Sequence, residues 1–123
     1  MSSFSEVRST IAEAIADPTS YNTITYPAPN PMPNTVCVLP ADPYITPSTI
    51  GRTSFDMNFR LELYANTADN QADLAIMEDM IESVLNLIPD YVVIDSVTAP
   101  DIFNAGSTIL TRSDIAVRVT ATM

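Results

Sequence analysis

The chain has 123 residues, with fifteen acidic side chains, five arginines, no lysine and no histidine, and therefore a formal charge of −10. This length suits one domain that holds its core without disulfides or metals, and 46% apolar residues are too many for a disordered chain. The charge excludes a basic surface that grips nucleic acid, and the lack of histidine excludes imidazole metal sites and Ser-His-Asp catalysis.

The excess of carboxylates allows two interpretations. Negative charge keeps a protein soluble, which needs no special function. The same charge on the lining of a ring would let DNA slide through without adhering, because like charges repel over roughly 8 Å at physiological salt. The sequence has no apolar run near the ~20 residues that span a bilayer. It also begins without the features of a signal peptide, so we expect synthesis in the cytoplasm.

The first predicted element is a helix from about Ser3 to Ala16. Ser3 and Glu6 have the spacing of a capping box, in which each side chain satisfies a free backbone N–H of the first turn. One apolar stripe follows helical spacing and contains Phe4, Val7, Ile11, Ala14 and Ile15. Asp17-Pro18 ends the helix, because the residue before a proline is pushed away from helical geometry.

A proline-rich region follows. Thr23 to Tyr26 resembles a short strand, and the prolines from Pro27 to Pro33 predict a stiff, extended arm because each lacks an N–H donor. Thr35 to Leu39 predicts a buried strand that Pro40 stops. Pro40 to Thr53 predicts a loop with three apolar residues, Tyr44, Ile45 and Ile50. This loop either folds over the edge of the core or forms an interface.

The clearest strand and the second helix come next. From Phe55 to Leu63, apolar residues alternate with polar ones, so one face is buried and the other is solvated. The helix from about Asn70 to Ile88 has an apolar stripe of Leu74, Met77, Ile81, Val84, Leu85 and Ile88. Met80 and Met77 are expected to fill the core or an interface.

Two more strands complete the predicted fold. Tyr91 to Val97 predicts a strand, Thr98 to Ser107 a loop, and Thr108 to Ala121 a last strand. On the last strand, alternation puts Ile109, Ile115, Val117, Val119 and Ala121 on one face. The expected fold class is α+β in a single domain, 1–123, in the order α-β-β-β-α-β-β. A mostly antiparallel sheet of about four to five strands carries both helices on one face.

The sequence gives no candidate catalytic, metal or cofactor site. Cys37 lies in a β-branched run with no nearby base, so a buried core cysteine is expected. Glu78, Asp79 and Glu82 have helical spacing that a metal site would also use, but a solvated helix face explains them better. Arg60 and Arg118 fall on the polar faces of strands, where they would pair with carboxylates of the same chain or of a neighbouring subunit.

The arrangement resembles a known family of virion proteins. The resemblance is carried by Tyr26-Pro27-x-Pro29 after a short helix and by Val36-x-Val38-Leu39-Pro40-x-x-Pro43-Tyr44. An alternating strand from Met57 to Leu63 then precedes an acidic amphipathic helix, and a last strand follows a loop containing Gly106. In these features the chain resembles the tail-terminator, or tail-completion, proteins of long-tailed bacteriophages.

The resemblance implies a non-enzymatic subunit of a ring, typically a hexamer, at the neck of the virion. Such a ring caps the head-proximal end of the tail tube and ends tube polymerisation. It also meets the head connector, while DNA passes through its lumen without specific binding. It needs no cofactor and no membrane. The candidate interface residues are then Tyr44, Ile45, Ile50, Arg60 and Arg118, with the Pro27–Pro33 arm as a further contact.

Two alternatives remain open at this stage. The chain is also compatible with another head–tail joining subunit or a tail-tube subunit, because element order separates these classes poorly. A different class is a monomeric acidic module that recognises a protein partner through its proline-rich loops. The mass of the assembled species distinguishes the module from the ring.

Overall fold

The protein is described from a computed structural model that places residues 4–19, 21–26, 32–47, 54–66, 70–105 and 108–122. Its elements follow in the order α1 (Phe4–Ile15), β1 (Asn22–Ile24), β2 (Thr35–Pro47), β3 (Ser54–Asn66), α2 (Asn70–Leu87), β4 (Val92–Val97), β5 (Asp101–Ala105) and β6 (Thr108–Thr122). The fold class is α+β, with two helices and a mostly antiparallel six-strand sheet. The expected fold is therefore confirmed, with β5 added to the expected order.

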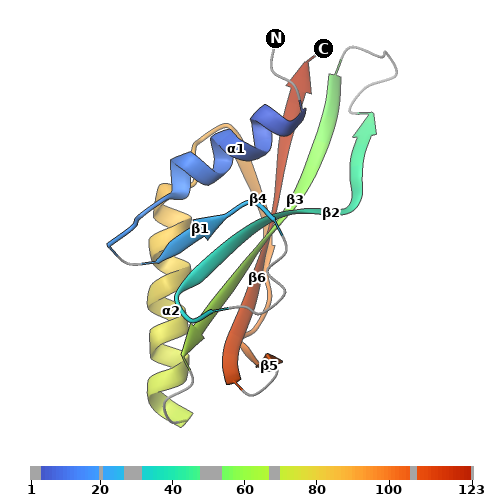
Figure 1. Cartoon of the computed structure of the whole chain (residues 1–123). Helices are drawn as coiled ribbons and strands as arrows, with labels where there is room; N and C mark the ends of the chain where they lie inside the picture. The colour runs from blue at the N-terminus through green and yellow to red at the C-terminus, as the bar shows by residue number, and fades with distance from the viewer. Residues whose placement is uncertain are drawn as a thin grey trace.

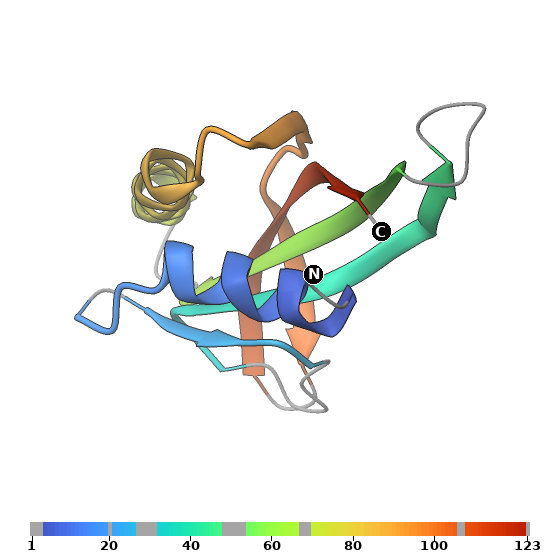
Figure 2. The ribbon, with the colours of Figure 1, turned by 90° about the horizontal axis from the view of Figure 1, so that it is seen from above.

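The sheet is built outward from β3 and β6. Its strand order is β1-β2-β3-β6-β4, and β5 pairs with β6 as well. All pairs are antiparallel except β1 with β2. Figure 1 shows both helices on one side of this sheet, and Figure 2 shows α2 nearly end-on while α1 lies lengthwise across the strands.

The strands β4 and β5 both pair with β6 and lie end to end along it. β4 pairs with residues from Ile115 to Val119 and β5 with residues from Thr108 to Arg112. Between them, the Thr98 N–H donates to the Asp114 carbonyl at 2.9 Å, and the Thr98 hydroxyl accepts from the Asp114 N–H at 2.9 Å. The prediction of a loop from Thr98 to Ser107 is therefore wrong for Asp101–Ala105. These residues form β5, because β6 provides a partner strand for them.

The face of the sheet that the helices cover carries the main core. Alternation on β3 and β6 places Phe59, Leu61 and Val117 there with no more than 1% of their surface exposed. From the helices, α1 contributes Ile11 and Ile15, and α2 contributes Met77, Met80 and Val84. The predicted register of both strands and the core role of the two methionines are confirmed.

Four sequence-based expectations need correction. Pro40 does not stop β2, because it pairs opposite Phe59 and a register shift between Pro40 and Ile45 lets the strand continue to Pro47. The predicted loop from Pro40 to Thr53 is thus strand as far as Pro47, and the rest lies outside the described residues. Leu74 and Ile109 were expected in the core but are 48% and 53% exposed, because both lie near the ends of their elements, beyond the packed centre.

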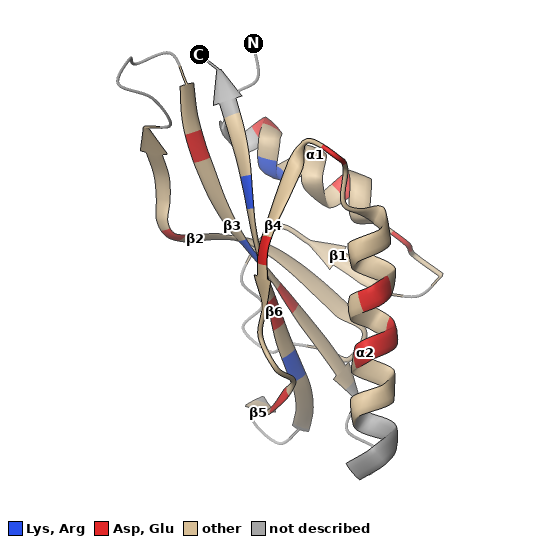
Figure 3. Ribbon diagram, turned by 180° about the vertical axis from the view of Figure 1, so that it is seen from behind, with Lys and Arg blue, Asp and Glu red and all other residues tan. Residues whose placement is uncertain are grey.

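Other predicted features are confirmed or lie outside the described residues. Cys37 is buried, and Glu78, Asp79 and Glu82 are exposed on α2 (Figure 3). The capping role of Ser3 and most of the Pro27–Pro33 arm fall outside the described residues. Within the part of the chain that is described, neither helix is both long and apolar enough to cross a bilayer.

Val117→Asp is expected to unfold the domain, because it puts a charge into the fully packed centre of β6. We expect a loss of roughly 4 kcal/mol or more in the free energy of unfolding, a large part of a small domain's stability. Ala116→Asp is the matched control, since Ala116 lies on the opposite face across from Arg60. Urea titration followed by circular dichroism compares the two variants. Equal midpoints would contradict the assigned faces.

Candidate functional site

The face of the sheet away from the helices, called here the outer face, carries a cluster of charged and aromatic side chains. At its centre Glu62 is only 7% exposed. One carboxylate oxygen accepts the Tyr64 hydroxyl at 2.7 Å. The other accepts the Arg60 Nε at 2.7 Å and the Arg112 Nη2 at 2.9 Å. All donors come from β3 and β6, so the antiparallel register alone assembles this group.

Arg112 links this cluster to β5. Its guanidinium lies 5.9 Å from the Tyr64 ring centroid and 5.5 Å from that of Phe103, distances at which cations are attracted to aromatic faces. Its Nε donates to Asp114 at 3.1 Å. Burial lowers the pKa of Arg112, but its hydrogen bond to Asp114 and the charges of Glu62 and Asp114 raise it by more. The guanidinium therefore stays charged.

Tyr64 is the titratable group that this environment changes most clearly. Burial, followed by its hydrogen bond to Glu62 and the charge of that carboxylate, raises the pKa of the Tyr64 phenol far above its ordinary value of 10.0. The ring also packs edge-on against Phe103 at 5.4 Å between centroids. Together with buried Cys37, Leu39 and Leu110, these side chains form a second, smaller core on the outer face. The face that alternation predicted to be solvated is therefore partly buried.

The described members of the predicted interface set lie on opposite faces of the sheet, with Arg60 and Arg118 on the outer face and Tyr44 and Ile45 against the main core. Arg60 pairs with Glu62, and Arg118 pairs with Asp95 at 3.5 Å, so both arginines have partners within the chain. Tyr44 and Ile45 are half-buried and pack against the main core, with the Tyr44 ring 5.7 Å from that of Phe59. Ile50 lies outside the described residues. Figure 3 shows the described arginines on α1, β3 and β6 and acidic bands along α2.

The edge of the sheet formed by β4 exposes apolar side chains on both of its faces. Val93, opposite Arg118, lies on the outer face and is 46% exposed. Ile94, opposite Val117, lies on the helix-covered face and is 44% exposed. Two further apolar side chains are exposed along this edge, Tyr91 just before β4 (56%) and Val97 at its end (38%). Among the described strands, β4 pairs only with β6, so its other edge is open.

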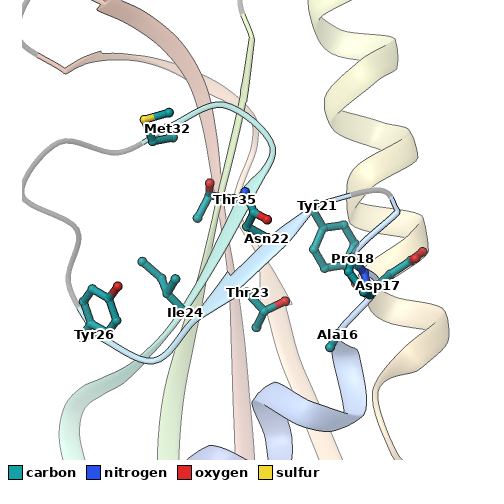
Figure 4. Close-up of a pocket in the computed structure, with 10 residues that line it drawn as sticks. All are labelled: Ala16, Asp17, Pro18, Tyr21, Asn22, Thr23, Ile24, Tyr26, Met32 and Thr35. Carbon is teal, nitrogen blue, oxygen red and sulfur yellow. The ribbon is translucent and has the colours of Figure 1, made fainter.

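The opposite edge of the sheet, at β1, borders a pocket with a volume of about 640 Å³. Figure 4 shows its walls, which come from the end of α1, from β1, and from the side chains of Tyr26, Met32 and Thr35. Tyr26 and Met32 are 60% and 65% exposed at its rim. At its base the Tyr21 hydroxyl donates to the Ile15 carbonyl, which satisfies one of the last carbonyls of α1.

The described surface features are a charged cluster on the outer face, an apolar strand edge at β4 and a pocket at β1. Among the described residues, no three His, Cys, Asp or Glu side chains gather closely enough to hold a metal ion. Sequence reasoning missed the β4 edge and the β1 pocket. The run from Tyr91 to Val97 is apolar on both faces, which is typical of a buried central strand. The sequence contains no signal that places this strand at an edge.

Comparison with known proteins adds no assignment to this chain. It matches no protein-family model and no curated protein.

Glu62→Ala is expected to lower the free energy of unfolding by about 2 kcal/mol, because it leaves Tyr64 without its acceptor and places two arginines together without their shared carboxylate. Asp114→Ala is the control, since Asp114 contacts Arg112 at a more exposed position and its removal should cost under about 1 kcal/mol. Urea unfolding at neutral pH measures both values. Equal losses would show that Glu62 has no central role.

Stability is also expected to fall at alkaline pH. Since the fold raises the pKa of Tyr64, the stability it contributes is complete below about pH 10, the ordinary pKa, and is lost as the pH rises toward the folded value. Tyr64→Phe should therefore flatten the decline between neutral and alkaline pH. Thermal melts of both proteins across that range measure the slope. A parallel decline would assign the effect to other groups, such as Tyr21, whose pKa is also raised by burial.

Proposed function

We propose that this chain is a structural virion subunit that assembles into a ring at the head-proximal end of a phage tail tube. In this role it ends tube polymerisation and joins the tail to the head connector, and DNA passes through the ring. Two separate arguments support the proposal. One feature of the fold supports self-assembly, and the sequence resemblance supports the place in the virion.

The feature that supports self-assembly is the open, apolar edge at β4. Soluble proteins protect edge strands with lysines, prolines or inward charges, because an open edge pairs with any other strand it meets. Here the strand carries one charged residue, Asp95, which is engaged by Arg118. Val93 and Ile94 remain exposed on the two faces. A strand of this kind is stable in solution when another chain covers it.

The helix face beside this edge extends the apolar surface. On α2, the flank containing Ile76 and Met80 faces Tyr21 and Asn34 on the β1 side. The other flank, with Leu74, Ile81 and Leu85, therefore turns toward the β4 side. Leu74 is 48% exposed, and the other two are half-buried. This flank therefore adds exposed and half-buried apolar side chains to those of the strand edge.

The place at the end of a tail tube rests on the family resemblance, and the charge is compatible with it. A formal charge of −10 keeps DNA from adhering to the lining of a ring. All three described ion-paired arginines, Arg60, Arg112 and Arg118, have carboxylate partners within the chain, which leaves little positive charge for phosphates. A neck or tube subunit of the same virion would share these properties.

A monomeric acidic binding module is the second candidate, and the pocket beside β1 favours it. An exposed strand edge with an adjoining pocket is one of the common ways in which a domain recognises an extended peptide. In that case the β4 edge would stay uncovered. The two candidates therefore differ in oligomeric state.

The decisive measurement is the mass of the assembled species by native mass spectrometry, for the chain alone and then with tail-tube protein. A closed ring in either condition is the expected result, and a monomer in both would contradict the proposal in favour of the binding module.

The contribution of β4 is tested with Ile94→Asp, which should leave the fold intact and reduce the assembled fraction at least tenfold. A carboxylate placed at the edge would be desolvated on contact, which costs well above the 1.4 kcal/mol of a tenfold change. Leu87→Asp is the matched control, because Leu87 is 38% exposed at the end of α2. If both variants assemble equally, the β4 edge is not the contact.

A further inference from the structure

The pocket beside β1 follows the open edge of that strand. Residues of both faces of the strand line it, with Asn22 and Ile24 from one face and Thr23 from the other. A pocket that lay on one face of a sheet would be lined by alternate residues only. This pocket therefore wraps around the edge itself, and Figure 4 shows the side chains of Ile24 and Thr23 pointing to different sides of the ribbon.

The backbone of Thr23 is directed to this open side. The Asn22 N–H points toward β2, because it donates to the Asn34 carbonyl at 2.8 Å. Successive residues of a strand turn their backbone groups to opposite sides, so the N–H and C=O of Thr23 point away from β2. These two backbone groups are the ones that a strand added at this edge would pair with.

The chain itself contains a strand that fits this edge. β4 is the outermost strand at the opposite side of the sheet, and among the described strands its outer edge is open. Val93 and Ile94 on β4 are exposed, as is Tyr91 just before it. The sheet therefore has a pocket at its β1 edge and exposed apolar side chains at its β4 edge, and such side chains could occupy the pocket of another copy. A contact between two different surfaces of the same chain repeats from copy to copy, and it forms a ring when the rotation closes.

We propose that β4 of one copy adds to the β1 edge of the next copy, with an apolar side chain of β4 seated in the β1 pocket. This inference rests on the ring proposed above and names its contact. Backbone hydrogen bonds between the two edges supply affinity, and the pocket sets the position of the partner strand. The alternative of two β4 edges meeting across a two-fold axis leaves the pocket empty and the β1 edge open.

The electrostatics favour an apolar contact of this kind. Two copies, each with a formal charge of −10, repel at long range. Among the described residues that line the pocket, Asp17 alone is charged, and it accepts a hydrogen bond from the Thr19 hydroxyl. The one charged residue of β4, Asp95, has Arg118 beside it, so the contact brings few carboxylates together. Assembly should strengthen as added salt screens the remaining repulsion.

The test is cross-linking between two singly substituted proteins. Tyr26→Cys places an exposed thiol at the rim of the β1 pocket and Ile94→Cys places one on β4, while a short bismaleimide tolerates small differences in register. An equal mixture should give at least tenfold more cross-linked dimer than either variant alone. A chain carrying both substitutions should give a ladder that ends at the ring number. Asn22→Cys, at an exposed position of β1, repeats the test if Tyr26→Cys folds poorly.

Two controls and the mass measurement make the outcomes distinct. The unsubstituted chain shows whether the buried Cys37 reacts, and Leu87→Cys mixed with Ile94→Cys should not cross-link. Strong cross-linking of Ile94→Cys alone would overturn the inference in favour of a two-fold β4 contact. A ring by mass without cross-links in the mixture would overturn the pairing and leave the ring proposal standing. A monomer by mass, alone and with tube protein, would overturn both.

Discussion

The pairing of β3 with β6 is the interaction on which the rest of this structure depends. The two strands are paired along the whole of β3, from Ser54 opposite Thr122 to Asn66 opposite Leu110. The ladder fixes two faces at once, because side chains alternate. One face presents Phe59, Leu61 and Val117 to the helices, and the other brings Glu62 beside Arg112. A slip of one residue would exchange the two faces and bury the charges.

The rest of the sheet is built outward from this pair in both directions. β2 extends the sheet from β3, and β1 adds three residues in parallel to it. β4 and β5 divide the far side of β6 between them. The helices close one face, while the cluster around Glu62 and the small core at Cys37 close part of the other. The result is a stable sheet that ends, at both sides, in strands with an open edge.

These open edges connect the fold to the proposed role. A ring is the simplest assembly in which two unlike edges of one chain are covered by copies of that chain. The same geometry would also protect Val93 and Ile94 from unspecific pairing, which is the hazard that exposed strands carry. In the proposed ring, stability and assembly would use different parts of the sheet, since the ion-paired cluster lies at its centre and the exposed apolar side chains lie at its margins. This separation would allow the two properties to be changed independently by substitution.

The sequence by itself determined the local structure and the faces of the central strands. Strict alternation from Phe55 to Leu63 and from Ile115 to Val119 predicted which side chains are buried, because a strand has one period and one buried face. Tertiary structure alone decided that Glu62 is buried, since its partner Arg112 is fifty residues away in the chain. It also decided that the run from Tyr91 to Val97 is an edge. An apolar strand has the same sequence whether it lies at the centre or at the margin of a sheet, and only the order of pairing distinguishes the two.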